Sequence, residues 1–373
     1  MRSVLVYRDV ILPRSEVGFM RRQYGGFRTL RPVWVGRRLT GDADALGMEA
    51  LRLGRGGLPG AFDRLAFKGL GLVPPVPDLR ALDPAVVHAQ FGRGGAFALP
   101  LARHLGVPLV VTFHGGDAHK NTHYARRFPP RLYQHRLDAL IAATARFVCV
   151  SDSVRDRLIE RGFPPGKLAV LPIGIDRADA ICAPADPPLL LFVGRFVEKK
   201  GLAVLIEALH RLGERAAPME VVIIGDGPLG PALRRQAAGL PRLRFLGWQP
   251  AGAVSAWMAR AAMLCVPSLR ARDGDAEGLP SVAVEAMALG LPVIAGSAAG
   301  LAGVVDPGRT GLVVPSGDAA ALADAILALR DDPDARRRMG QAGRARVQRD
   351  FDAAVQSRRL EALLLEVAGE AVR

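Results

Sequence analysis

The chain has 373 residues, 50% of them apolar and 6% aromatic, a composition that suits two packed domains and excludes a disordered chain. No uninterrupted run of about 18 apolar residues and no secretory signal is apparent, which argues against a spanning helix and against export. Cys149, Cys182 and Cys265 lack metal-ligand spacing and indicate buried thiols in a reducing compartment. We therefore expect a cytoplasmic protein without a metal site.

Most of the positive charge lies in the first half of the chain. The formal net charge is +14, and residues 1–176 carry 26 Lys and Arg against 14 Asp and Glu. Basic and aromatic residues interleave here, over 19–38 and 124–131. This pattern favours an anionic partner, either a membrane surface at its inner face or a phosphorylated acceptor, with nucleic acid the least expected. An arginine excess that reflects only codon usage stays the alternative.

Short apolar runs alternate with helical patterns along the chain, which is typical of a doubly wound α/β sheet. In the first half we expect strands at 3–7, 85–89, 108–113, 146–150 and 168–172, and helices at 95–105 and 152–162. After a Pro- and Ala-rich linker, 177–188, we expect strands at 189–193, 219–224, 243–246, 262–266, 292–295 and 311–314, and helices at 200–213, 230–238, 281–289 and 319–330. A helical tail covers 334–368. The pattern predicts domains over 1–176 and 189–349.

Two segments of the first domain carry polar residues just after strands. Ser15 and Glu16 follow the first strand, where Ser15 either caps a helix or, with Glu16, faces an acceptor. His114 ends the strand 108–113 and precedes two glycines and Asp117, so a ligand can approach its ring closely. A purely structural role for His114 is an equally open alternative.

In the second domain, Arg195 and Lys200 follow an apolar strand, at the end of a strand where open α/β sheets bind ligands. Together they could hold a diphosphate without Mg²⁺. Two solvated lysines, Lys199 and Lys200, in a basic loop are the plain alternative.

The segment 225–230 formally matches the dinucleotide pattern G-x-G-x-x-G through Gly225 and Gly227. No acidic residue follows the next strand to bind a ribose, so NAD binding is a weak hypothesis.

The strongest motif spans 277–285 and places two carboxylates eight positions apart across a turn and a helix start. Gly278 permits a tight turn, and with Leu279 it precedes a helix whose free N–H groups can hold an anion. Glu277 could then face sugar hydroxyls, and Glu285 a ribose diol. Two solvated carboxylates at an ordinary helix start would be the alternative.

These segments resemble glycosyltransferase family 4, the retaining enzymes of the GT-B fold. The run 193–201 looks like the diphosphate motif of that family and 277–285 like its paired-glutamate motif, with similar flanks at 286–295 and 308–315. The form of 112–115 and of 273–275 is similar to its exopolysaccharide and colanic-acid branch. A loop without paired glycines at 11–16, and Gly303 in place of an acid, depart from the family pattern.

The resemblance implies two Rossmann-like domains facing each other across a cleft, with a C-terminal helix, 350–373, that packs back on the first. It implies that Arg195, Lys200 and Glu285 hold a nucleotide sugar, that Glu277 contacts its sugar, and that His114 points from the acceptor side. We therefore take Glu277 and His114 as the candidate catalytic residues, and Ser15, Glu16 and Asp117 as candidates on the acceptor side. The acceptor would be a glycan or a lipid-linked oligosaccharide. Rival hypotheses are a nucleotide-sugar epimerase or hydrolase, a non-catalytic nucleotide- or polyanion-binding protein and an NAD-dependent oxidoreductase.

Overall fold

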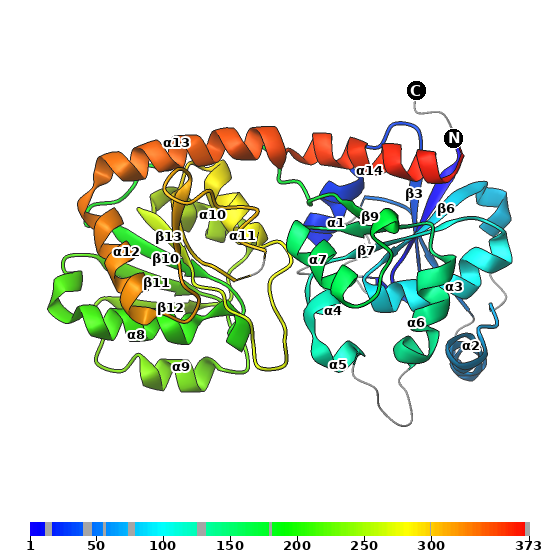
Figure 1. The fold of residues 1–373 in the computed structure, drawn as a ribbon, viewed down its shortest axis with the longest axis horizontal. Coiled ribbons are helices and arrows are strands. Elements are labelled where there is room, and N and C mark those ends of the chain that lie inside the picture. Colours follow the sequence, from blue (N-terminus) through cyan, green and yellow to red (C-terminus); the bar gives the residue numbers. More distant parts are fainter. Residues whose placement is uncertain are drawn as a thin grey trace. The chain divides into compact units, whose positions relative to one another are not determined.

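The computed structural model describes residues 1–11, 17–39, 47–54, 57–73, 79–124, 132–178, 181–298 and 300–369 (Figure 1). The chain forms two compact units, one made of Met1–Gly174 with Ala353–Arg373 and the other of Ile175–Asp352. Each unit is built around its own parallel sheet with helices packed against it. This confirms the predicted class, two doubly wound α/β domains. The predicted cleft concerns the placement of one unit against the other and stays a prediction.

The first unit contains a seven-stranded parallel sheet in the order β5-β3-β1-β6-β7-β8-β9. Its strands are β1 (Ser3–Tyr7), β3 (Arg31–Gly36), β5 (Ala50–Arg52), β6 (Pro84–Gln90), β7 (Leu109–Phe113), β8 (Arg146–Cys149) and β9 (Leu168–Val170). The short β2 (Val10–Ile11) and β4 (Arg38–Leu39) pair separately. β1, β6 and β7 are buried along their whole length, which explains their near-continuous apolar sequences. The strand order reverses between β1 and β6.

Helices cover this sheet and leave the carboxyl ends of its strands to loops. They are α1 (Val17–Tyr24), α2 (Gly57–Leu70), α3 (Gly92–Leu105), α4 (Gly116–His119), α5 (Asn121–Tyr124), α6 (Leu132–Ala143), α7 (Asp152–Glu160) and α14 (Ala353–Val367). Ser151 caps α7 by accepting the N–H of Val154. Tyr24, Trp34 and Leu364 belong to one buried cluster, so the last helix completes the core of the first unit.

The carboxylate of Glu361 ties α14 to the turn before β3. Its oxygens accept the backbone N–H groups of Arg28, Thr29 and Leu30 at 2.6–3.0 Å. Ser357 accepts the N–H of Gly26 at 3.0 Å. Three consecutive backbone N–H groups that make no hydrogen bond within the sheet therefore donate to one side chain near the C-terminus.

The second unit contains a six-stranded parallel sheet in the order β12-β11-β10-β13-β14-β15. The strands are β10 (Leu189–Val193), β11 (Glu220–Ile224), β12 (Leu243–Gly247), β13 (Met263–Val266), β14 (Val293–Gly296) and β15 (Gly311–Val314). The helices are α8 (Leu202–Leu212), α9 (Gly230–Gln236), α10 (Ala251–Arg260), α11 (Ser281–Ala288), α12 (Ala319–Asp331) and α13 (Pro333–Asp350). The strand order reverses between β10 and β13.

The segment 177–188, predicted as a linker, is counted with the second unit. Its backbone donates from Cys182 to Leu289, from Ala183 to Ala259 and from Ala185 to Arg260, at 2.8–2.9 Å. A segment without hydrophobic periodicity is thus held in place by backbone hydrogen bonds to residues at the C-terminal ends of α10 and α11.

The basic and aromatic stretch 19–38 is divided between the surface and the core, since Arg21, Arg28 and Arg31 are exposed. Met20 and Trp34 are fully buried, and Arg37 is 6% exposed and paired with Asp9. Trp34 lies in β3, a strand that the sequence did not predict because Arg31 and Pro32 open it. In the second stretch, Tyr124 is half-buried, and residues 125–131 lie outside the described residues.

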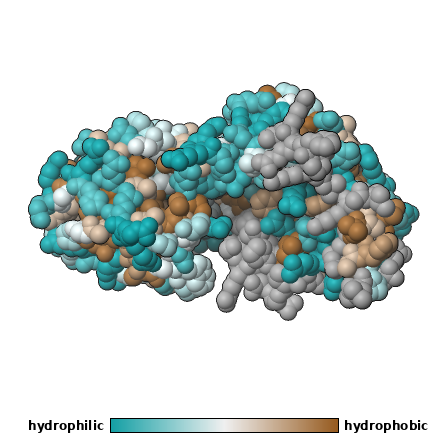
Figure 2. All heavy atoms as spheres, turned by 90° about the horizontal axis from the view of Figure 1, so that it is seen from below, coloured by the Kyte–Doolittle hydropathy of each residue, from teal (hydrophilic) through white to brown (hydrophobic). Residues whose placement is uncertain are grey.

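Apolar side chains on the surface form separate patches among hydrophilic ones (Figure 2). In the described segments, no helix is both long enough and apolar enough to cross a bilayer.

Candidate active site

The second unit places the predicted donor residues at one edge of its sheet. Arg195 and Lys200 lie in the loop after β10, and Glu277 lies in the loop after β13. These neighbouring strands flank the point where the strand order reverses. Open α/β sheets bind their ligands outside the carboxyl ends of strands at such a point.

Lys200 and Glu277 form an ion pair at this edge, with Nζ 3.2 Å from Oε1. Their side chains are 19% and 8% exposed, so the pair lies mostly out of water. Gly201 ends the 3₁₀ turn before α8 at a φ of 66°, and a Cβ there would lie 1.8 Å from the carbonyl oxygen of Pro267. Glycine at 201 therefore lets the Lys200 loop approach the β13 loop.

Lys199 holds the same two loops together. Its Nζ lies 3.2 Å from Asp275 and 3.9 Å from Glu277, and its carbonyl oxygen accepts the N–H of Leu269. The alternative of two lysines in open water is wrong, because the Lys199 and Lys200 side chains are both about one-fifth exposed. Arg195 is the exposed cation of this loop.

Gly225 and Gly227 shape the site from the β11 side. A Cβ on Gly225, at a φ of 135°, would lie 1.9 Å from the carbonyl oxygen of Gly194, and one on Gly227 would lie 2.6 Å from that of Phe196. Phe196 also donates its N–H to Asp226. These glycines let the β11 loop pack against the loop that carries Arg195, and this packing explains them without a dinucleotide.

The turn after Glu277 leads into α11. Gly278 is buried, Leu279 is half-buried, and Glu285 lies half-buried within the helix. Pro280 is the N-cap residue of α11, and within the described part of the chain no side chain caps this end. The first N–H groups of α11 and its positive dipole end are therefore suited to an anion.

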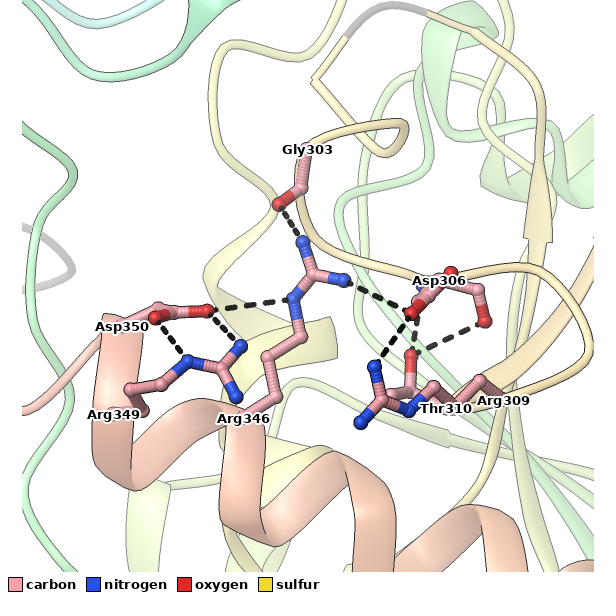
Figure 3. Close-up of polar contacts among 7 residues, drawn as sticks. All are labelled: Gly303, Asp306, Arg309, Thr310, Arg346, Arg349 and Asp350. Carbon is pink, nitrogen blue, oxygen red and sulfur yellow. Dashed lines mark hydrogen bonds and ion pairs between the residues drawn. The ribbon is translucent and has the colours of Figure 1, made fainter.

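The loop 300–310 packs against the Glu277 turn. A side chain of α13 holds the same loop (Figure 3). A Cβ on Gly300 would lie 2.7 Å from the carbonyl oxygens of Glu277 and Gly278. Further along, the guanidinium of Arg346 donates to the carbonyl oxygen of Gly303 at 2.9 Å and lies 4.0 Å from Asp306. The family pattern has an acidic residue at position 303. Here Gly303 binds Arg346 through its backbone carbonyl oxygen instead.

In the first unit, His114 lies at the carboxyl end of β7, half-buried. Its Nε2 lies 2.7 Å from Oε1 of Gln90, and its ring lies against Phe91 with centroids 4.3 Å apart. Loss of water around the ring, with Arg8 and His88 nearby, lowers the pKa of His114 to about 3. The imidazole is therefore neutral at pH 7.

Asp117 organises the loop that carries His114. It is 8% exposed and accepts the N–H groups of Gly92, His114 and Gly115, each at 3.0 Å. Burial raises the pKa of Asp117, and these backbone donors oppose that change. The structure thus shows Asp117 positioning His114 and α3.

The other predicted acceptor residues, Ser15 and Glu16, lie outside the described residues. The sequence analysis missed His88 and Gln90, two fully buried polar residues next to His114. The sequence did contain a signal for them. His88 and Gln90 are polar residues two positions apart in an apolar strand, so their side chains lie on the same face of the sheet.

The arrangement in the second unit joins cations, a helix N-terminus and carboxylates at a switch point, which suits a ligand with phosphates and hydroxyl groups. Solved structures with the same fold are GT-B glycosyltransferases. HepE of Anabaena, solved with UDP and glucose, has a TM-score of 0.78 at 18% identity and covers 98% of this chain and 100% of its own. Sucrose-phosphate synthase of Thermosynechococcus elongatus has a TM-score of 0.76 at 20% identity, covering 99% and 100%.

The fold is therefore the GT-B fold, and matches to family models and relatives define the class as a glycosyltransferase. The model for glycosyl transferases group 1 matches residues 178–346, and that for glycosyltransferase family 4 matches 48–179. WcaL of Escherichia coli K12, assigned to colanic acid biosynthesis, is 33% identical over 74% of this chain and 69% of its own length. AmsK of Erwinia amylovora, an amylovoran biosynthesis glycosyltransferase, is 33% identical over 77% and 71%. The chain belongs to glycosyltransferase family 4.

Proposed function

We propose that this glycosyltransferase moves a sugar from a nucleotide-sugar donor to a hydroxyl group of a glycan or lipid-linked acceptor, with retention of configuration, in cell-surface polysaccharide biosynthesis. The observation that carries the proposal is the ion pair of Lys200 and Glu277 at the β10/β13 switch point, beside the N-terminus of α11. The donor diphosphate and the sugar hydroxyls need these two kinds of group side by side.

In this proposal Arg195 and Lys200 neutralise the diphosphate as it leaves, so no metal ion is needed. Glu285 accepts hydrogen bonds from the ribose, and Glu277 from the donor sugar. The bond from the anomeric carbon to the diphosphate breaks, a bond to the acceptor oxygen forms on the same face, and the acceptor proton passes to the leaving phosphate oxygen. His114, from the first unit, contacts the sugar or acceptor.

The proposed setting is the cytoplasmic face of a membrane. The names of WcaL and AmsK point to extracellular polysaccharides, whose lipid-linked intermediates are amphiphilic. In the first unit, α2 exposes Phe62 and Leu65 at 72% and 70%, and Leu72 follows at 58%. Apolar side chains on a positively charged unit suit an anionic lipid surface.

The site is tested by replacing Arg195→Met, Lys200→Met and Glu277→Gln and measuring transfer from UDP- and GDP-sugars, with and without EDTA. We expect kcat/KM to fall by about 100- to 1000-fold for each variant, since each removes a group that faces developing charge, and EDTA to have no effect. Arg211→Met is the matched control, because Arg211 pairs with Glu207 on the exposed face of α8.

Unchanged turnover in all three variants would contradict the site. Consumption of the donor without any acceptor would instead show an epimerase or a hydrolase. Binding of nucleotide without turnover would show a binding protein.

A further inference from the structure

Behind His114, the first unit contains a continuous chain of buried polar side chains. It consists of His114, Gln90, Tyr24, His88 and Thr112, contributed by β6, β7 and the end of α1. Apart from the half-buried His114, each is at most 2% exposed. A buried network of this kind fixes geometry when every donor meets an acceptor.

In the structure the amide nitrogen of Gln90 points away from His114. Its Nε2 donates to Oε1 of Gln23 at 3.1 Å and to the hydroxyl of Tyr24. The atom that faces His114 is therefore the carbonyl oxygen of Gln90, 2.7 Å from Nε2. A carbonyl oxygen only accepts, so Nε2 of His114 has to carry the proton.

The other hydrogen bonds of this buried network can run in the same direction, from donor to acceptor. The Tyr24 hydroxyl accepts from Gln90 and donates to Nδ1 of His88 at 2.8 Å, and Nε2 of His88 donates to the hydroxyl of Thr112 at 2.7 Å. Burial raises the pKa of Tyr24 and lowers that of His88 to about 3, so both stay neutral. Each link then has one donor and one acceptor.

We propose that Gln90 is a positioning residue that holds His114 as the Nε2-protonated tautomer, with Nδ1 as the accepting edge of the ring. This inference rests on the proposed function in one respect, the contact of His114 with substrate. A group that meets Nδ1 there must donate, so the chemistry recognised is a sugar or acceptor hydroxyl and not a phosphate oxygen.

The charged neighbours of His114 among the described residues agree with a neutral ring. The guanidinium of Arg8 lies 4.0 Å from the centre of the Phe91 ring that stacks on His114, and its charge disfavours an imidazolium. Asp117 contacts the backbone N–H of His114, where its charge is shared among three N–H donors. His88 lies behind Gln90 and is neutral.

The test is a long-range ¹H–¹⁵N NMR spectrum of the histidine rings in the full chain, recorded without substrate. In the native protein we expect His114 with its proton on Nε2 and a pyridine-like Nδ1. Gln90→Leu removes the acceptor, so the two ring nitrogens should shift toward each other as tautomers mix. Gln90→Glu, nearly identical in shape, should place a carboxylate at Nε2 and raise the pKa of His114 in an NMR titration.

Thr112→Val is the matched control, because it removes a hydroxyl from the far end of the same chain without touching Gln90 or His114. It should leave the His114 spectrum unchanged. For transfer, Gln90→Leu should lower kcat/KM about tenfold, Thr112→Val less than about twofold, and Gln90→Glu should restore part of the loss at high pH.

A native His114 protonated on Nδ1, or the same ring shifts in Gln90→Leu, would overturn the inference. Absence of transfer in the native protein would count against the proposed function alone, since the NMR result does not depend on turnover.

Discussion

His88 and His114 make the first unit sensitive to acid. The pKa of each is lowered to about 3 by burial, whereas a histidine in the unfolded chain has a pKa of about 6.5. Between these values the unfolded chain binds protons that the folded chain does not. The free energy of unfolding therefore has its full value above pH 6.5 and falls as the pH is lowered below it.

We predict that the free energy of unfolding falls by about 1.4 kcal/mol per pH unit for each of these histidines between about pH 6.5 and 5. Urea unfolding followed by circular dichroism at several pH values measures the slope. His88→Gln should be less stable at pH 7. Its free energy of unfolding should also fall less steeply with pH, by about 1.4 kcal/mol per pH unit. An equal slope in the two proteins would show that His88 does not titrate in this way.

At the scale of single residues, the sequence predicted which polar groups lie at one edge of the second sheet, because the motifs that carry them are local. Arg195, Lys200, Glu277 and Glu285 come from two short motifs, and the strand ends bring these motifs together. The pairing of Lys199 with Asp275 and the contact of Gln90 with His114 were missed, since each joins residues from separate strands or loops.

At the scale of elements, α14 stabilises the first unit through one carboxylate. Glu361 is 6% exposed and serves three consecutive N–H groups before β3. Removing it would leave three donors without their acceptor, and for the buried N–H of Leu30 the loss costs more than the hydrogen bond itself contributes.

We predict that Glu361→Ala lowers the free energy of unfolding by about 3 kcal/mol, and Glu361→Gln by less because one oxygen remains. Glu366→Ala on the same helix is the control, since its side chain is 67% exposed beside Arg146, and it should change stability by less than about 0.5 kcal/mol. Chemical denaturation measures all three. Equal losses for Ala at 361 and 366 would refute the role of Glu361.

Most elements of the second unit were predicted from the sequence to within two residues, because β10, β11 and β15 are apolar runs bounded by Gly or Pro. The elements that were missed, such as β3, α2 and α10, begin at or beside Gly or Pro, residues that mark loops in a sequence. Their structure is decided by burial against neighbours distant in the sequence, which a local pattern does not contain.

At the scale of the molecule, the charge asymmetry and the apolar face of α2 belong to the same unit. Phe62 and Leu65 are one helical turn apart and exposed, while Phe67 is fully buried in the core. A helix that buries one aromatic ring and presents another to solvent is suited to rest on a surface.

We predict that the protein sediments with vesicles of phosphatidylglycerol and phosphatidylcholine, and less with vesicles of phosphatidylcholine alone or at high salt. The double variant Phe62→Ser and Leu65→Ser should bind the anionic vesicles about tenfold more weakly. Ile159→Ser is the control, an exposed apolar residue on α7 of the same unit. Equal binding to both kinds of vesicle would contradict an electrostatic surface.

The chain leaves the first unit after Gly174 and returns to it at Ala353. During synthesis on the ribosome, all residues of the second unit emerge before α14 does, whereas the turn at 28–30 must wait for Glu361. The first unit is thus begun first and completed last, and a chain that ended before α14 would contain all residues of the second unit but an incomplete first unit.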